Sequence, residues 1–298
     1  MRVLIIGCGY LGSVLGQKLT EQGYPVIGVT RSEKSARGLD ALGIESRIAN
    51  CSTFEGAQLA CRDGAETVVF CVSSRPPFRD YQQTYVEGMR CTLHALEKQP
   101  PRLFIHVGSA SVYAQTTGEW VTEASPAEPP HENGRFLLKT EQLLAHAARG
   151  RFKAYSLRLS GIYGPTRHAL LDQLREGVKT LPGDGSHWMN QIYRNDIVEA
   201  MIFLMKLGIR NTKHVILNLS DDTPVLQRDY VEWCCRQIGR TSPVFMPDET
   251  ASSGRERKGF RSNRRICNQA LKSLGWTPRY PSYREGLLSE SGGMEISP

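Results

Sequence analysis

The first 31 residues constrain the fold more than any other stretch of this 298-residue chain. Residues 2–6 form a short apolar run with β-branched side chains, which is typical of a buried strand. Three glycines follow within residues 7–12, and leucine and valine then recur at helical spacing as far as Gly23. A second apolar run covers residues 26–29. The pattern predicts a strand, a glycine-rich turn, a helix and a second strand.

Each glycine of the turn has a mechanical reason in a dinucleotide-binding unit. Gly7 permits a tight turn, Gly9 lets the backbone approach a pyrophosphate, and Gly12 allows close packing of helix on strand. The free N–H groups at the start of the helix attract the phosphates. We therefore expect the turn, with Tyr10 and Leu11, to bind a dinucleotide.

The end of the second strand indicates which dinucleotide is bound. NAD-binding sites usually place a carboxylate there to accept a hydrogen bond from the ribose 2′-hydroxyl. This chain instead has Thr30, Arg31 and Ser32, followed by Lys34, and an arginine can pair with a 2′-phosphate. The sequence therefore favours NADP, with NAD as the alternative. Arg31 and Lys34 would otherwise belong to a solvated loop.

Strands and helices continue to alternate beyond residue 31. Further strands are expected over 44–48, 67–72 and 103–107, and helices over 35–42, 54–61 and 81–98. Such alternation predicts a parallel sheet covered by helices on both faces, the doubly wound Rossmann class of α/β fold. Ligands bind at the carboxyl ends of these strands, so Val72 is a further expected cofactor contact.

Composition and termini bound the class of protein. The chain is 40% hydrophobic and contains no apolar run long enough to cross a bilayer. Met1 leads directly into the first predicted strand, so we expect no signal peptide and a cytoplasmic protein. The eight cysteines lack metal-ligand or redox spacing, and we expect them to be reduced.

The net charge of +7 is concentrated near the end of the chain. Residues 251–284 contain nine basic side chains and only Glu256 as an acid, a net charge of 9 − 1 = +8. Nucleic acid, a small phosphorylated ligand and plain solvation are all compatible with this charge. Aromatic residues are sparse in its densest part, 255–265, so nucleic acid is the least favoured of the three.

Several motifs in order along the chain resemble those of one family. They are Ser109–Tyr113, Glu123 with Pro126, Arg158–Pro165, Asn190–Ala200, Ser262–Asn268, and Leu274–Trp276 with Tyr280–Leu287. Together with the glycine turn they resemble the extended or atypical short-chain dehydrogenases/reductases, the NAD-dependent epimerase/dehydratase family. The resemblance implies a Rossmann domain over 1–165, completed by about 191–220. It also implies a smaller substrate lobe over 166–190 and 221–298.

The family resemblance implies catalysis by a serine, a tyrosine and a lysine, the last two four residues apart on a helix. Ser109 and Lys139 match two of these positions, and the lysine also contacts the cofactor in such enzymes. The tyrosine position is Arg135. No tyrosine occurs between residues 114 and 154, and none of the eleven tyrosines has lysine four residues later. The standard pair is therefore absent in any alignment register.

Arginine cannot replace the tyrosine as an acid or base, because its guanidinium stays protonated near neutral pH. We expect Arg135, Ser111 and Asn190 to contact an anionic substrate, unless Arg135 turns into solvent. If proton transfer persists, Tyr113 is the first candidate for the acid and His131 the second. His106 lies inside a predicted strand and is expected to be a core residue.

Two classes of function follow from this reading. The first is an NADP-dependent oxidoreductase or epimerase-like enzyme with an altered proton relay, whose small substrate is phosphorylated or nucleotide-linked. The second is an NADP-binding protein without turnover, in which the cofactor serves structure or regulation. The resemblance also implies a homodimer formed through helices at about 80–98 and 132–148.

Overall fold

The computed structural model describes residues 1–74, 80–207, 213–246 and 262–290. The chain forms two compact units. Unit 1 comprises Met1–Tyr113, Ala127–Leu159 and Ile197–Leu217, and unit 2 comprises Ala114–Pro126, Ser160–Asp196 and Asn218–Pro298.

The predicted domains and the observed units differ over four short segments, 114–126, 160–165, 191–196 and 218–220, and strand pairing within unit 2 accounts for the first three. β6 (Trp120–Val121) pairs with β15 (Arg265–Ile266), which places residues 114–126 in unit 2. β8 (Gly161–Tyr163) pairs with β11 (Gln191–Tyr193), which does the same for residues 160–165. The intervening helix α5 (Glu132–Ala148) belongs to unit 1.

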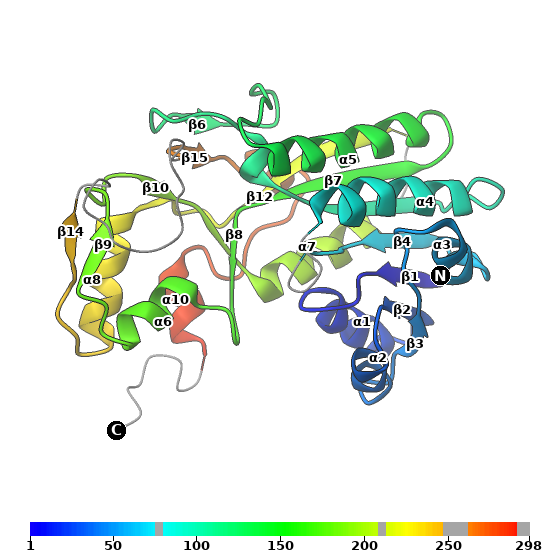
Figure 1. Cartoon of the computed structure of the whole chain (residues 1–298), viewed down its shortest axis with the longest axis horizontal. Coiled ribbons are helices and arrows are strands. Elements are labelled where there is room, and N and C mark those ends of the chain that lie inside the picture. Colours follow the sequence, from blue (N-terminus) through cyan, green and yellow to red (C-terminus); the bar gives the residue numbers. More distant parts are fainter. Residues whose placement is uncertain (75–79, 208–212, 247–261, 291–298) are drawn as a thin grey trace. The chain divides into compact units, whose positions relative to one another are not determined.

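Unit 1 is built on a seven-stranded sheet with the order β12-β7-β5-β4-β1-β2-β3 (Figure 1). The strands are β1 (Val3–Ile6), β2 (Val26–Thr30), β3 (Glu45–Ile48), β4 (Thr67–Phe70), β5 (Leu103–Ser109), β7 (Lys153–Leu159) and β12 (His214–Leu219). The pairings that join β3, β2, β1, β4, β5 and β7 are all parallel. Every residue of β1 and β4 is buried, as expected for parallel strands covered on both faces. The predicted α/β Rossmann class is confirmed.

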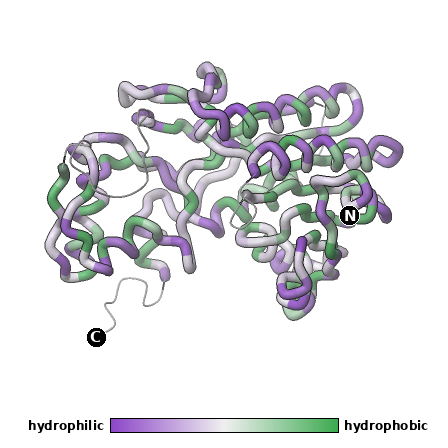
Figure 2. Tube along the Cα trace, in the orientation of Figure 1, coloured by the Kyte–Doolittle hydropathy of each residue, from purple (hydrophilic) through white to green (hydrophobic). Residues whose placement is uncertain are grey.

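Helices cover both faces of this sheet (Figure 1). They are α1 (Gly12–Glu21), α2 (Glu33–Asp40), α3 (Phe54–Cys61), α4 (Gly88–Ala95), α5 and α7 (Arg194–Lys206). In Figure 1, α4 and α5 lie on one side of the sheet and α1 and α2 on the other. Hydrophilic residues recur along α4 and α5, whereas hydrophobic residues dominate the strands (Figure 2).

The predicted helix over 81–98 is interrupted. Residues Gln82–Glu87 form a π-helical segment, η1, and regular α-helix follows only from Gly88 to Ala95. The apolar residues Tyr85, Met89 and Leu93 recur at a spacing that suits either form, so the sequence pattern does not distinguish them. Single π-helical turns often occur near functional sites.

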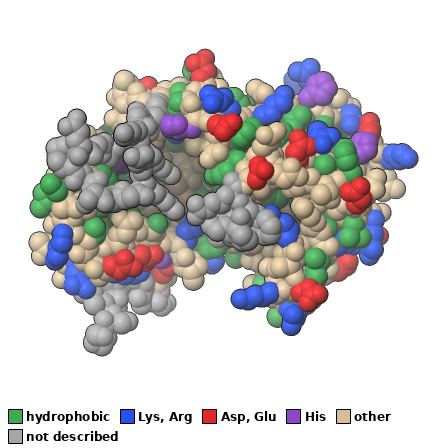
Figure 3. Space-filling model, in the orientation of Figure 1, with side chains coloured by type: hydrophobic (Ala, Val, Ile, Leu, Met, Phe, Trp, Pro, Cys, Tyr) green, Lys and Arg blue, Asp and Glu red, His purple; other side chains and the backbone are tan. Residues whose placement is uncertain are grey.

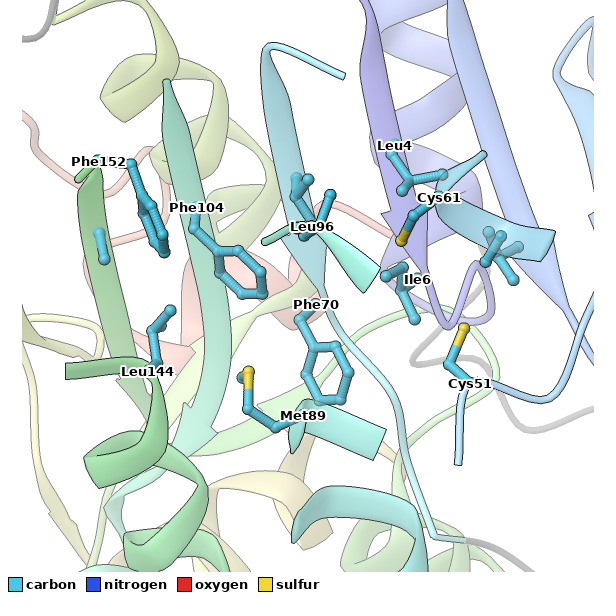
Figure 4. Close-up of a cluster of buried hydrophobic side chains, with 14 of the residues drawn as sticks. Leu4, Ile6, Cys51, Cys61, Phe70, Met89, Leu96, Phe104, Leu144 and Phe152 are labelled. Atoms are coloured by element: carbon cyan, nitrogen blue, oxygen red, sulfur yellow. The ribbon is translucent and has the colours of Figure 1, made fainter. Parts of the chain in front are cut away.

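The core of unit 1 joins the sheet to α3, α4 and α5. Phe70 and Phe104 come from adjacent strands, with ring centroids 6.5 Å apart, and Phe152 packs on Phe104 at 6.2 Å. Met89 of α4 and Leu144 of α5 pack against these rings (Figure 4). Burying each such side chain contributes roughly 1.5–3 kcal/mol to stability.

Unit 2 is a smaller assembly of short strands and helices. Its remaining elements are α6 (Ala169–Arg175), β9 (Thr180–Pro182), β10 (Trp188–Met189), β13 (Val225–Leu226), α8 (Gln227–Gln237), β14 (Val244–Met246), α9 (Gln269–Ser273) and α10 (Tyr283–Leu288). Its core is rich in tyrosine. Tyr163 packs edge-on against Tyr193 at 5.2 Å, and Tyr230 lies 4.8 Å from Tyr283.

Candidate functional site

A pocket of about 160 Å³ opens at the carboxyl ends of β1, β2, β3 and β4 in unit 1. Its walls come from the segments that follow these strands, Ile6–Gly9, Val29–Arg31, Ala49–Ser52 and Val72–Ser73, with Ser35, Thr84 and Gly88 completing it. This is where a doubly wound sheet binds its ligand. The pocket lies entirely within one unit.

The glycine turn leaves room in this pocket. Gly7 has φ +85°, and a Cβ there would lie 2.6 Å from the Cα of Val72. A Cβ on Gly12 would lie 2.9 Å from the side chain of Ile5, which explains the need for glycine where α1 packs on the sheet. A Cβ on Gly9 would meet only the carbonyl oxygen of Gly7, at 3.9 Å, so space remains beside this exposed residue. The first turn of α1 carries no acid. These features fit a dinucleotide pyrophosphate.

The predicted cofactor residues divide into two groups. Gly7, Gly9, Thr30, Arg31 and Val72 line the pocket. The pocket lining does not include Tyr10, Leu11, Gly12, Ser32 or Lys139.

Several other residues that line the pocket were not among the predicted cofactor contacts. Asn50, Cys51 and Ser52 follow β3, and Thr84 belongs to η1. The Gln83 side-chain amide donates to the carbonyl oxygen of Ser52 at 2.9 Å, so η1 is joined to the rim of the pocket. Residues 50–52 follow a predicted parallel strand, and this position could have identified them as pocket residues.

Ser109 ends β5 and begins a short 3₁₀ turn, Ala110–Val112. Its Oγ accepts a hydrogen bond from the backbone N–H of Ser111 at 3.1 Å. The start of α5 packs against this turn, because a Cβ on Gly134 would lie 3.3 Å from the carbonyl oxygen of Ser111. The predicted serine loop and the predicted lysine helix are therefore neighbours in unit 1.

Arg135 and Lys139 are exposed and lie one helical turn apart on α5. The guanidinium of Arg135 makes a long contact of 3.5 Å with the carbonyl oxygen of Pro130. Within the described part of the chain, neither cation forms an ion pair with a carboxylate. An anion beside both would relieve their mutual repulsion.

Tyr113 is completely buried. The guanidinium of Arg158 lies 4.8 Å from the centroid of its ring, and Arg158 forms a doubly hydrogen-bonded pair with Glu141 at 2.6 and 3.0 Å. A phenol enclosed in this way does not favour the predicted exchange of protons with a ligand.

His131, a candidate acid, and His106, an expected core residue, lie in different environments. His131 is exposed at the N-terminus of α5. His106 is 1% exposed in β5, with its Nδ1 3.3 Å from the Oγ of Ser156. Burial lowers the pKa of His106 to about 3, so the imidazole is neutral. This is the core position predicted for His106.

Asn190 of unit 2 uses both polar atoms of its side chain internally. Its Nδ2 donates to the carbonyl oxygen of Arg264 at 2.8 Å, and its Oδ1 accepts from the backbone N–H of Ile266 at 2.7 Å. Asn190 therefore braces β15, an arrangement that does not favour the predicted contact with substrate.

The basic segment predicted over 251–284 is only partly described. Arg255, Arg257, Lys258 and Arg261 lie outside the described residues. Arg264 is 7% exposed, and the Nζ of Lys272 pairs with Asp222 at 2.9 Å. Figure 3 shows basic and acidic side chains interspersed over unit 1 on the face in view. Among the described basic residues of this segment, Arg264 is buried and Lys272 is paired, whereas Arg279 and Arg284 are exposed.

The described residues hold no cluster of three or more histidine, cysteine or acidic side chains arranged for a metal ion. All eight cysteines are unpaired thiols. A helix long and apolar enough to cross a membrane is also missing from the described ranges.

Comparison with known proteins identifies the family. Residues 3–219 match the model of the NAD dependent epimerase/dehydratase family. The chain belongs to this family, as its motifs predicted.

Three individual proteins illustrate the similarity. Protein YeeZ of Escherichia coli K12 is 28% identical over 286 residues, covering 94% of this chain and 96% of its own. A dTDP-6-deoxy-L-talose 4-dehydrogenase (NAD(P)(+)) of Kitasatospora kifunensis is 23% identical over 93% of this chain and 91% of its own. The structure of UDP-glucose 4-epimerase from Thermotoga maritima with UDP-glucose superposes with a TM-score of 0.80 at 22% identity, covering 96% of each chain.

Proposed function

We propose that this chain is an NADP-dependent oxidoreductase of epimerase/dehydratase type that acts on a small, anionic, nucleotide-linked substrate. The observation that carries the cofactor preference is Arg31, which lines the pocket at the carboxyl end of β2. NAD-binding sites usually have a carboxylate there. Bound NADPH would supply a hydride from its nicotinamide ring, and bound NADP⁺ would accept one there.

The start of α2 supports a site for the 2′-phosphate of NADP beside Arg31. Ser35 lines the pocket, and the Ser32 hydroxyl donates to the Ser35 Oγ at 3.0 Å while accepting from its N–H at 3.3 Å. Glu33 is the acid of this turn, and it pairs with Arg37 at 3.6 Å. A phosphate here would meet a guanidinium, two hydroxyls and the positive end of a helix.

The preference is tested by replacing Arg31 with alanine. We expect Arg31→Ala to weaken NADP⁺ binding by roughly 10- to 100-fold and to leave NAD⁺ binding within about 3-fold, because only NADP⁺ carries the 2′-phosphate. Isothermal titration calorimetry with both dinucleotides measures this. Arg37→Ala is the matched control, because it removes an exposed arginine of the same segment that does not line the pocket. Equal losses for the two dinucleotides would contradict the assignment.

The chemistry of the substrate side is assigned to Ser109, Lys139 and Arg135. Ser109 positions a substrate oxygen by a hydrogen bond, and Lys139 holds the cofactor ribose, the roles that the family resemblance implies. Arg135 keeps its proton, so its role is to stabilise negative charge on an oxygen of the substrate. Arg135 and Lys139 form no ion pair with any described carboxylate, which supports an anionic substrate.

Names of relatives support a nucleotide-linked substrate. The dehydrogenase of Kitasatospora kifunensis is named for a dTDP-sugar, and the Thermotoga maritima epimerase binds UDP-glucose. We extend this class of substrate to the present chain.

A second function remains because Arg135 occupies the tyrosine position of the family pattern. A chain without a replacement acid would bind NADP without turning it over. The enclosure of Tyr113 supports this alternative, because a buried phenol is a poor candidate for that acid.

A further inference from the structure

Arg265 of unit 2 is held between two indole rings. Its guanidinium carbon lies 5.1 Å from the ring centroid of Trp120 and 5.1 Å from that of Trp188. The three residues come from β15, β6 and β10, which are far apart in the sequence. Such contacts between a cation and aromatic rings fix the plane of a guanidinium.

Backbone hydrogen bonds hold this arrangement in place. The Nε of Arg265 donates to the carbonyl oxygen of Gly118 at 2.8 Å. The backbone N–H of Arg265 donates to the backbone carbonyl oxygen of Glu119 at 2.8 Å. The backbone N–H of Trp188 donates to the side chain of Asn263 at 2.9 Å. Gly118 has φ +83°, and a Cβ there would lie 3.2 Å from the Nε1 of Trp188, so glycine lets the loop approach the ring. The guanidinium is therefore preorganised.

The charge of Arg265 is not neutralised by the described residues. No carboxylate among them lies within 4 Å of its guanidinium, and its two terminal nitrogens have no hydrogen-bond acceptor there. The carboxylate of Glu119 accepts hydrogen bonds from Thr117. A hydrogen bond from the backbone N–H of Glu119 itself, then those from Thr117 and to a smaller extent the charge of Arg264, lower the pKa of Glu119. The fixed fork of Arg265 thus keeps two donor groups for an outside oxyanion.

Trp120 offers a surface beside these donors. It is 52% exposed, although an indole of this size is usually well covered. A nucleobase that stacks on an exposed indole gains stacking energy, whatever the identity of the base. The arrangement therefore presents a donor pair for phosphate next to a platform for a ring.

We propose that Arg265, between Trp120 and Trp188, binds the phosphate of a nucleoside diphosphate whose ring rests on Trp120. This inference rests on the proposed nucleotide-linked substrate and names the residues of unit 2 that bind its nucleotide part. The planar fork of arginine matches two phosphate oxygens, a geometry that lysine does not reproduce.

The test uses calorimetry of the full-length chain with UDP, pyrophosphate and uridine as probes. We expect UDP to bind more tightly than pyrophosphate, and uridine to bind at least 10-fold more weakly than UDP. Arg265→Gln should weaken UDP binding by roughly 10- to 100-fold, and Arg265→Lys by several fold despite its retained charge. Trp120→Ala should weaken UDP binding more than pyrophosphate binding, because it removes only the platform.

Arg284→Gln is the matched control. Arg284 is also an arginine of unit 2, and its guanidinium carbon lies 5.5 Å from the ring centroid of Tyr283. We expect Arg284→Gln to leave UDP binding unchanged. Undiminished UDP binding by Arg265→Gln would overturn the proposal, as would no saturable UDP binding by the wild type. If Arg265→Gln loses its native near-ultraviolet circular dichroism, Arg265→Lys decides the question.

NADP⁺ titrations separate this proposal from the proposed function. Arg265→Gln should bind NADP⁺ as the wild type does, because Arg265 and the dinucleotide pocket belong to different units. A wild type that binds UDP through Arg265 but not NADP⁺ would refute the cofactor assignment alone. A wild type that binds NADP⁺ but not UDP would refute the Arg265 site alone.

Discussion

Asp221 shows how a single side chain can limit stability. This carboxyl is 1% exposed, and its Oδ1 accepts from the backbone N–H of Thr223 at 3.2 Å. Its Oδ2 has no hydrogen-bond partner within the described ranges. Burial raises the pKa of Asp221 well above its usual value. Ionisation of Asp221 therefore costs free energy in the folded state.

We predict that Asp221→Asn stabilises the protein at neutral pH. Below about pH 4 the carboxyl is neutral in both the folded and the unfolded state, so Asp221 does not lower the free energy of unfolding of the wild type. As pH rises from there through the raised folded pKa, the wild type loses stability and the variant does not. The gain should reach about 1–2 kcal/mol near pH 7 and vanish toward pH 4.

Urea unfolding at pH 4 and pH 7 measures this difference. Asp222→Asn is the control, since Asp222 is paired with Lys272 and should give no gain. A variant at position 221 that is no more stable than the wild type at pH 7 would contradict the account of the unpaired oxygen.

Individual residues were predictable from sequence where the backbone dictates the residue type. Gly7 and Gly12 are such positions, because a Cβ would collide with the sheet. Tyr113 was a candidate acid and Asn190 a candidate substrate contact, and in the structure Tyr113 is buried and the Asn190 side chain is hydrogen-bonded within unit 2. Sequence spacing places a residue on an element, but the direction of its side chain depends on neighbours from distant strands.

At the scale of elements, one buried ion pair joins α5 to the sheet. Glu141 of α5 and Arg158 of β7 are 5% and 3% exposed, and they form two hydrogen bonds. Glu141 lies two residues after Lys139, so the pair fixes the helix that carries Arg135 and Lys139. Removing one partner leaves the other charge buried and unpaired.

We predict that Glu141→Gln destabilises the protein by about 3–5 kcal/mol, because it leaves the Arg158 charge uncompensated. The double change Glu141→Gln with Arg158→Met should recover much of this loss. Guanidinium unfolding curves measure both. Glu45→Gln removes a 65% exposed partner of Arg47 and serves as control, with an expected cost of at most about 1 kcal/mol. A Glu141 variant as stable as this control would show that the pair does not hold α5.

Element types were largely predictable because apolar periodicity reflects burial. The helix Phe54–Cys61 has the predicted bounds, and β1 to β5 lie where apolar runs predicted strands. The π-helical segment Gln82–Glu87 was not predictable, because its hydrogen bonding depends on packing that the apolar pattern does not encode. For this reason the sequence also did not predict that Thr84 lines the pocket.

At the scale of the whole molecule, the sequence predicted the α/β class and the family, and both are confirmed. The grouping of 114–126 with unit 2 was not predicted, since it depends on pairing between strands that are more than 140 residues apart in the chain. For the same reason, the sequence did not predict that Arg265 lies between Trp120 and Trp188.

The central proposal is that this chain turns over NADP on a nucleotide-linked substrate, with Arg135 where the family resemblance implies a tyrosine. The most direct measurement is the absorbance of NADPH mixed with the protein and a panel of dTDP- and UDP-linked keto sugars. We predict that the absorbance falls with the wild type and at least about 100-fold more slowly with Lys139→Ala, because we propose that this lysine holds the cofactor beside the substrate. NADPH that stays bound and unconsumed across the panel would contradict the claim and identify a binding protein without turnover.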